Sequence, residues 1–161
     1  MAEAEEPEPE PEPEEPEPEA VYEEPEEETT VLSTVTFKPY EDYRCITDQS
    51  SLQWQLIQQA YHEPDGRLTI DGFTLVALGR YWGPVGTRYE ATIGGKTVYI
   101  LKGDAKADCD TMACDGFCGP DGHIIELIVD TDLLSEEVIY HGDCSLIPEL
   151  AGQIEKIEVI E

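Results

Sequence analysis

The chain has little positive charge. Its 161 residues contain 9 Lys and Arg against 37 Asp and Glu, which gives a net charge of −28 at pH 7. Binding to phosphates requires a basic surface, so we expect no nucleic acid partner. The chain also lacks any apolar run close to the roughly 20 residues that span a bilayer, so we expect no membrane insertion by this chain.

Familiar signatures of cofactor and nucleophile chemistry are missing as well. There is no P-loop, dinucleotide fingerprint or EF-hand spacing, and we expect no cofactor. His123 and His141 lie apart from any serine or cysteine pattern that would form a catalytic triad. The first residues are neither a secretory signal nor a lipidation site. Two interpretations stay open: a soluble protein, or a chain from which an upstream anchor, signal or domain has been removed.

Negative charge is concentrated at the start of the chain. Residues 1–28 contain 15 Glu, 7 Pro and no Lys or Arg, in an imperfect Glu-Pro repeat. Such a segment cannot bury enough apolar surface to offset its ordering entropy, and its charges repel one another. We therefore expect residues 1–30 to be a disordered acidic tail or spacer. Residues 31–161 should form one globular domain, with a lead-in and helix over 37–62 and a β-barrel over 67–161.

The five cysteines are odd in number, and three of them lie close together. A spacing of Cys-x4-Cys-x3-Cys-x4-His is formed by Cys109, Cys114, Cys118 and His123. These groups could supply four tetrahedral zinc ligands, but the spacing matches no usual Cys-x2-Cys knuckle. We favour a Gly-rich surface loop closed by one disulfide, with Cys45 and Cys144 paired or a thiol left free. Disulfides would indicate an oxidising compartment.

The hydrophobic pattern predicts a mainly β domain. Residues 50–61 begin with serines suited to capping and carry an apolar stripe, which predicts a helix. A second, short helix is predicted from Ser135 to Gly142, and Gly94-Gly95 predicts a hairpin turn. Runs of β-branched and aromatic residues predict six strands, at 68–70, 74–78, 88–93, 97–101, 124–129 and 154–160.

Three short motifs narrow the fold further. Val85-Gly86-Thr87 opens one strand, Gly103-Asp104 closes the next, and Ile125-Glu126-Leu127 lies inside an apolar strand. Together with the later helix and final strand, they resemble the double-psi β-barrel of the three-aspartate (3D) domain of lytic transglycosylases, rare lipoprotein A and expansins. The resemblance implies a small six-stranded double-psi-like β-barrel, with one preceding helix and one short inserted helix.

The lead-in to this region resembles that of a loose group of bacterial and phage-encoded proteins. The matching segments are Tyr43-Arg44-Cys45-Ile46-Thr47, Ser50-Ser51, Trp54-Gln55-Leu56, Gly79-Arg80-Tyr81-Trp82 and residues 103–108. When these lead-in segments are included, the resemblance covers about residues 37–161. The barrel resemblance implies a cell-wall-associated domain that acts on peptidoglycan, in an extracellular or cell-wall location; a phage virion or the cytoplasm is the alternative.

Glu126 is the strongest catalytic candidate among the residues. A carboxylate set among Ile and Leu must be neutralised, paired or used, and burial would raise its pKa. An acid still protonated near neutral pH could donate to a glycosidic oxygen. The simpler alternative is an ion pair with Lys102, Lys106 or Arg88. For Asp104, the alternative is a turn residue that accepts backbone N–H groups.

The resemblance also implies a mechanism. One acid would protonate the leaving oxygen and then, as a base, help the sugar's own 6-hydroxyl close an anhydro ring. Asp104 would orient the substrate or stabilise positive charge at the anomeric carbon. Two departures weaken this assignment: Glu126 stands where the transglycosylases have Asp, and the turn lacks the Gly that normally follows their Asp by two. A longer side chain would displace the acid in a positioned site.

Further residues are candidates for binding a glycan. They are Tyr81, Trp82, Thr87, Lys106 and Asp108. Aromatic faces suit sugar rings, although buried aromatic residues are commoner. Three classes of function follow: a lytic peptidoglycan enzyme, a non-catalytic module that binds cell-wall glycan, and a structural or interaction domain of a phage or surface protein. We expect a monomer.

Overall fold

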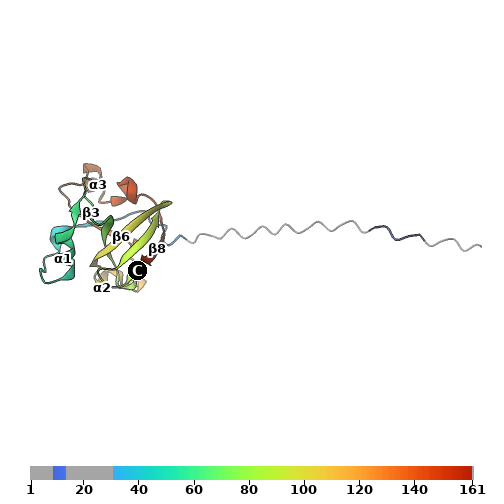
Figure 1. The fold of residues 1–161 in the computed structure, drawn as a ribbon, viewed down its shortest axis with the longest axis horizontal. Helices are drawn as coiled ribbons and strands as arrows, with labels where there is room; N and C mark the ends of the chain where they lie inside the picture. The colour runs from blue at the N-terminus through green and yellow to red at the C-terminus, as the bar shows by residue number, and fades with distance from the viewer. Residues whose placement is uncertain (1–8, 14–30, 161) are drawn as a thin grey trace, which may run out of the picture.

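A computed structural model describes residues 9–13 and 31–160. Residues 9–13 are exposed and have no regular secondary structure, and the rest of the expected acidic tail lies outside the described residues. Three helices, α1 (Leu52–Gln59), α2 (Asp108–Thr111) and α3 (Glu136–His141), lie around the strands (Figure 1). None of the helices in the described part is long and apolar enough to cross a membrane.

The strands form one mixed eight-stranded sheet. Their bounds are β1 Tyr40–Asp42, β2 Tyr61–His62, β3 Leu68–Ile70, β4 Phe73–Leu78, β5 Arg88–Ile93, β6 Lys96–Ala105, β7 Glu126–Val129 and β8 Ile154–Ile160. The order is β1-β7-β4-β6-β5-β8, with β3 paired to β4 and β2 to β3. The β1–β7 and β4–β6 pairings are parallel, and the other pairings are antiparallel. Among the described residues no ladder joins β1 to β8, so strand pairing does not close the sheet into a barrel.

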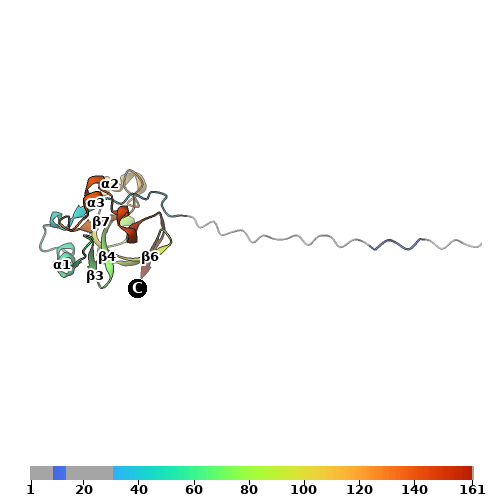
Figure 2. The same cartoon turned by 90° about the horizontal axis from the view of Figure 1, so that it is seen from above.

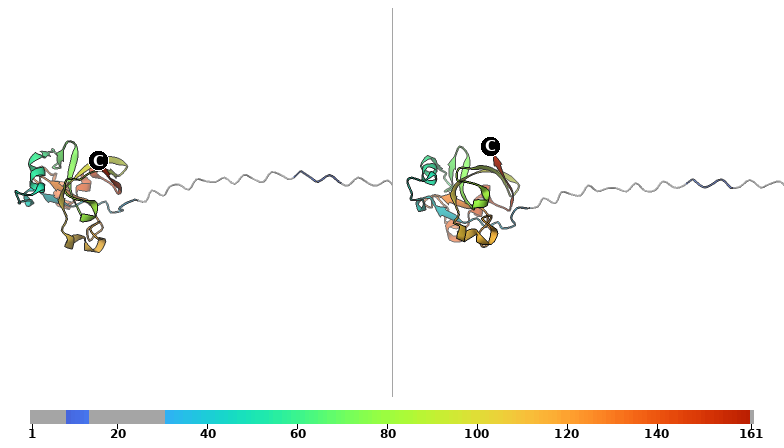
Figure 3. Two further views of the ribbon diagram at one scale, coloured as in Figure 1. Left: turned by 60° about the horizontal axis from the view of Figure 1, so that its bottom comes forward. Right: turned by 90° about the horizontal axis from the view of Figure 1, so that it is seen from below.

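The mainly β class is confirmed, but the count of six strands was too low. The two additional strands, β1 and β2, are only three and two residues long. Strand β1 pairs with β7, which is distant along the chain, and β2 pairs with the nearby β3. Neither strand has a clear hydrophobic pattern of its own. The sheet curves strongly around its interior (Figure 3).

Two apolar clusters hold the elements together. Tyr89, Ile100 and Leu127 belong to the larger cluster, whereas Leu75 and Ile128 belong to a smaller one. The central strands β4 and β7 contribute to both clusters, so nearly every residue in them is buried. Figure 2 shows α1 at one side of the domain, where it contacts β6. This helix packs onto the smaller cluster.

Local signals account for the helix ends. The Ser51 hydroxyl accepts a hydrogen bond from the backbone N–H of Trp54 (3.1 Å), and the Ser135 hydroxyl accepts one from Val138 (3.2 Å). Gly142 ends α3 with a left-handed backbone (φ 61°) that suits glycine. Both predicted helices are therefore confirmed, each slightly shorter than expected. The additional short helix α2 lies in the cysteine-rich loop.

A buried lysine ties the lead-in to the end of the domain. The Lys38 ammonium donates to the carbonyl oxygens of Thr36 (2.9 Å) and Gly152 (2.7 Å). Burial lowers the pKa of Lys38 to about 8, although Asp143 nearby opposes this shift. Ser33 also bridges to Ile154 at the start of β8. These contacts fix the approach of the chain to β1, which carries one wall of the candidate site.

Candidate active site

A pocket of about 340 Å³ lies where β1, β7, β4 and the end of β6 come together. Small or rigid residues, including Ala77, Ala105, Ala107, Gly119 and Pro120, leave space for it. Its ionisable side chains are Glu41, Asp104, Lys106, Asp110, His123 and Glu126. The structure therefore brings together Glu126, Asp104 and Lys106, which the sequence had singled out, and adds Glu41.

Strand register explains why Asp104 and Glu126 face the same space. Ala77 on β4 is the register partner of Glu126 on β7 and of Asp104 on β6. The β4–β6 register passes from Lys102 to Asp104, so Gly103 is an extra, bulged residue. A bulge redirects the side chain that follows it. Asp104 thereby points to the same side as Glu126.

The bulged position also has little room for a side chain. A Cβ atom at residue 103 would lie 2.9 Å from Ile128 Cδ1 and 3.3 Å from the side chain of Leu75. The motif Gly103-Asp104 thus lies inside β6, which continues to Ala105, and does not close a strand as the sequence suggested. Asp104 Oδ1 accepts a hydrogen bond from the backbone N–H of Ala105 (2.8 Å). Asp104 therefore binds a backbone N–H as expected, but it does so within a strand and not in a turn.

Glu41 is the carboxyl with a strongly raised pKa in this pocket. Burial is the largest cause, followed by a side-chain hydrogen bond with Asp104 and by the negative charges of Asp104 and Glu126. Together they raise the pKa of Glu41 to about 9. Two carboxyl groups can share a hydrogen bond only if one of them keeps a proton. The pocket therefore holds a carboxylic acid that is still protonated at neutral pH.

Lys106 faces this group of carboxyls from the segment after β6. Its residue is only 9% exposed, and burial lowers its pKa, while the charges of Glu126, Asp121 and Asp110 oppose that shift. Its ammonium has no hydrogen-bond partner among the described residues. A buried ammonium normally has partners, so the unpartnered ammonium of Lys106 marks it as a candidate group for binding a ligand.

The ion pairs that the sequence offered as an alternative for Glu126 are not formed. None of the ion pairs among the described residues includes Glu126. The Lys102 ammonium instead donates to the carbonyl oxygens of Gly79 (3.1 Å) and Gly83 (2.7 Å), which holds the turn before β5. Arg88 lies over the ring of Phe73, 4.8 Å from its centroid. Glu126 is half-buried at the pocket with its carboxylate uncommitted to a basic side chain.

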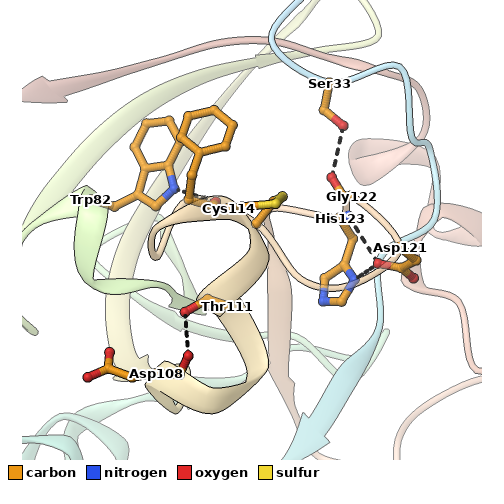
Figure 4. The surroundings of a disulfide bond; sticks show 10 residues. Ser33, Trp82, Asp108, Thr111, Cys114, Asp121, Gly122 and His123 are labelled. Carbon is orange, nitrogen blue, oxygen red and sulfur yellow. Dashed lines mark hydrogen bonds and ion pairs between the residues drawn. A yellow bond between two sulfur atoms is a disulfide. The ribbon is translucent and has the colours of Figure 1, made fainter.

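The cysteine-rich loop forms another wall and does not form the zinc site considered above. Cys114 and Cys118 are joined by a disulfide, which removes two of the four candidate ligands (Figure 4). Within the described ranges no group of three or more His, Cys, Asp and Glu side chains is placed to hold a metal ion. His123 instead contacts Asp121 through Nδ1. The favoured disulfide loop is the arrangement observed.

The other cysteines are not paired in the structure. Cys45 and Cys109 are exposed, and Cys144 is buried. The alternative of a Cys45–Cys144 disulfide is therefore wrong, and the alternative of free thiols holds. Burial raises the pKa of the Cys144 thiol to about 12, which keeps it protonated and unreactive.

The aromatic candidates lie outside the pocket lining. Trp82 donates its indole N–H to the carbonyl oxygen of Phe117 (3.0 Å), and the two rings lie 5.0 Å apart (Figure 4). Tyr81 packs at 5.0 Å from Phe117 and is 63% exposed. Thr87 donates to the carbonyl oxygen of Pro84 (2.7 Å).

Asp108 is exposed at the start of α2, and its backbone carbonyl accepts from Thr111 (Figure 4). Of the five binding candidates, Lys106 is therefore the one that lines the pocket.

Sequence reasoning missed Glu41. It lies in the run Tyr40-Glu41-Asp42-Tyr43, where an acidic pair between two tyrosines was the available signal. Its neighbour Asp42 binds Arg44 and Thr131, which hold the pKa of Asp42 well below its usual range. Asp42 is thus committed to structure, while Glu41 on the alternate side of β1 faces the pocket.

Comparisons with known proteins found no similarity. No family model matches the chain, and no curated protein or solved structure matches it.

Proposed function

We propose that this domain cleaves the glycan of peptidoglycan by acid–base catalysis, with the Glu41–Asp104 pair as its proton source. The proposal rests on the pocket that Glu41, Asp104 and Glu126 line, where burial and the neighbouring carboxyls raise the pKa of Glu41 to about 9. A general acid works best with a pKa near the pH at which it acts. The bacterial cell wall as partner, and an extracellular or cell-wall location, come from the sequence resemblance.

In the proposed reaction, the shared proton passes to the glycosidic oxygen. The bond from that oxygen to C1 breaks, and its electron pair stays on the leaving oxygen. Glu126 stabilises the positive charge that develops at C1. The sugar's own 6-hydroxyl oxygen then bonds to C1, and its proton returns to the carboxyl pair. No water is consumed, and no second nucleophilic carboxylate is required, unlike in most glycosidases.

The double-psi barrel is part of the same proposal. The features that support it are the two parallel pairings, β1 with β7 and β4 with β6, within a curved and otherwise antiparallel sheet. Parallel pairs require crossover connections, as an interlocked barrel would. The Gly103-Asp104 and Ile125-Glu126-Leu127 motifs also meet at one pocket.

Purified peptidoglycan and mass spectrometry of its soluble products test this function. The wild-type chain should release fragments that end in anhydro sugars. Glu41→Gln, which keeps the shape and removes the proton, should abolish release while circular dichroism stays unchanged. Glu158→Gln on exposed β8 is the matched control and should cleave normally. Absence of products from a well-folded wild-type protein would refute catalysis.

A non-catalytic glycan-binding role is the second candidate, because Tyr81 exposes its ring beside Trp82 and Phe117. Such a platform could stack on a sugar without help from the pocket. Sedimentation with insoluble peptidoglycan would then survive Glu41→Gln and fail for Tyr81→Ala. Retention of sedimentation by Tyr81→Ala would contradict this role.

A further inference from the structure

Two buried side-chain polar atoms lack a hydrogen-bond partner among the described residues, Glu41 Oε1 and Lys106 Nζ. Both side chains line the same pocket. Leaving such atoms unsatisfied costs free energy, and native structures contain few of them. Two such unsatisfied atoms in one pocket indicate side chains that bind a ligand and do not serve to stabilise the fold.

The chemistry of the two atoms defines the ligand. Lys106 offers a donor and requires an acceptor. Glu41 Oε1 has no hydrogen-bond partner among the described residues and can accept from a ligand donor. An anionic ligand would suit Lys106 alone, but Glu126 and Asp110 in the same pocket would repel it. The ligand group is therefore neutral and carries both a donor and an acceptor.

The positions of Glu41 and Lys106 also fix how the ligand's donor and acceptor must be oriented. Glu41 belongs to β1 and Lys106 follows β6, and in the sheet order β7 and β4 lie between those strands. Ala77 and Glu126, from β4 and β7, form the floor between these two walls. The ligand must therefore present its donor to one wall and its acceptor to the opposite one. A trans secondary amide does so, because its planar bond points N–H and C=O in opposite directions.

We infer that the pocket binds a secondary amide, whose carbonyl oxygen accepts from Lys106 Nζ and whose N–H donates to Glu41 Oε1. Both polar atoms are now covered, so a small rotation of each side chain must accompany binding. Peptidoglycan offers this group in two places, the acetamido groups of its sugars and the bonds of its peptides. The choice of peptidoglycan as the source of the amide rests on the proposed function. The binding mode itself does not require that the protein cleaves peptidoglycan.

Isothermal titration calorimetry of the full chain with three probes tests the inference. Tetra-N-acetylchitotetraose and cellotetraose share a β-1,4 backbone and differ at the acetamido group, while N-acetyl-tetraalanine amide carries the amide on a peptide. Chitotetraose should bind at least about tenfold more tightly than cellotetraose, the effect of one good hydrogen bond to a charged group. Binding of the peptide in place of chitotetraose would support the inference with a peptide source.

Variants separate this inference from catalysis. Lys106→Met should weaken binding of the preferred probe about tenfold or more, whereas Lys156→Met on exposed β8 should leave it unchanged. Glu41→Gln keeps a carbonyl oxygen and should still bind, although it cannot supply the proton for cleavage; Glu41→Leu should lose binding.

Equal affinity for both sugars, no binding of any probe, or binding insensitive to both Lys106→Met and Glu41→Leu would overturn the inference. Amide binding without cleavage of peptidoglycan would refute only the proposed reaction. Cleavage without amide selectivity would refute only the binding mode.

Discussion

Glu41→Gln should make the folded protein more stable, and the gain should grow with pH. In the folded state the pKa of Glu41 is raised from 4.5 to about 9. Between these values the unfolded chain releases a proton that the folded chain keeps. The free energy of unfolding of the wild type therefore falls as pH rises through this interval. Glutamine is neutral in both states and avoids that loss.

The size of the effect follows from the pKa shift. One pKa unit corresponds to about 1.4 kcal/mol, so the interval from 4.5 to pH 7 gives about 3.5 kcal/mol at most. Partial access of water and the coupling to Asp104 reduce this value. We expect Glu41→Gln to unfold with a free energy about 1–3 kcal/mol higher than the wild type at pH 7, and with almost no difference at pH 4.

Urea unfolding at pH 4, 5.5, 7 and 8.5 measures this dependence for both proteins. Glu158→Gln is the control, since its carboxylate is exposed at β8 and its substitution should produce no comparable pH-dependent gain. A Glu41→Gln protein that is destabilised equally at every pH would refute the reasoning. That result would mean that Glu41 is ionised in the folded state and that its negative charge stabilises the pocket.

Three other measurements bear on the structure. Gly79→Ala would place its Cβ atom on the carbonyl oxygen of Gly116, so urea unfolding should show a loss of about 2 kcal/mol or more; an unchanged midpoint would contradict that packing. Iodoacetamide should label Cys45 and Cys109 in the folded protein but Cys144 only after unfolding, as counted by mass spectrometry; rapid native labelling of Cys144 would contradict its burial. Cleavage of peptidoglycan should decline above about pH 9, where the carboxyl pair loses its proton; a rate still rising there would exclude the pair as the acid.

Features set by neighbouring residues could be predicted from the sequence. The start of α1 follows from the hydroxyl of Ser51, and its packing face follows from the spacing that buries Ile57. A disulfide within the cysteine-rich loop also follows from the local spacing of its cysteines, although the spacing did not select the pair Cys114–Cys118. In each case the interacting groups are close along the chain, so the pattern carries the necessary information.

Features set by distant contacts could not be predicted. Strand β1 has three residues and exists because it pairs with β7. The raised pKa of Glu41 depends on that pairing and on Asp104, which the Gly103 bulge redirects into the pocket. The sequence marked Asp104 and Glu126 as candidates, and the acidic pair beside Tyr40 and Tyr43 could not by itself show that the proton would lie on Glu41.

The proposed chemistry requires that Glu41 is protonated at neutral pH. A carbon-13 NMR titration of the glutamate side-chain carboxyls, with Glu41 assigned by its loss in Glu41→Gln, measures this protonation. The Glu41 resonance should stay at its protonated position through pH 7 and titrate with an apparent pKa near 9, coupled to Asp104. A Glu41 resonance that titrates near 4.5 would show that Glu41 is ionised at neutral pH and cannot be the proton source.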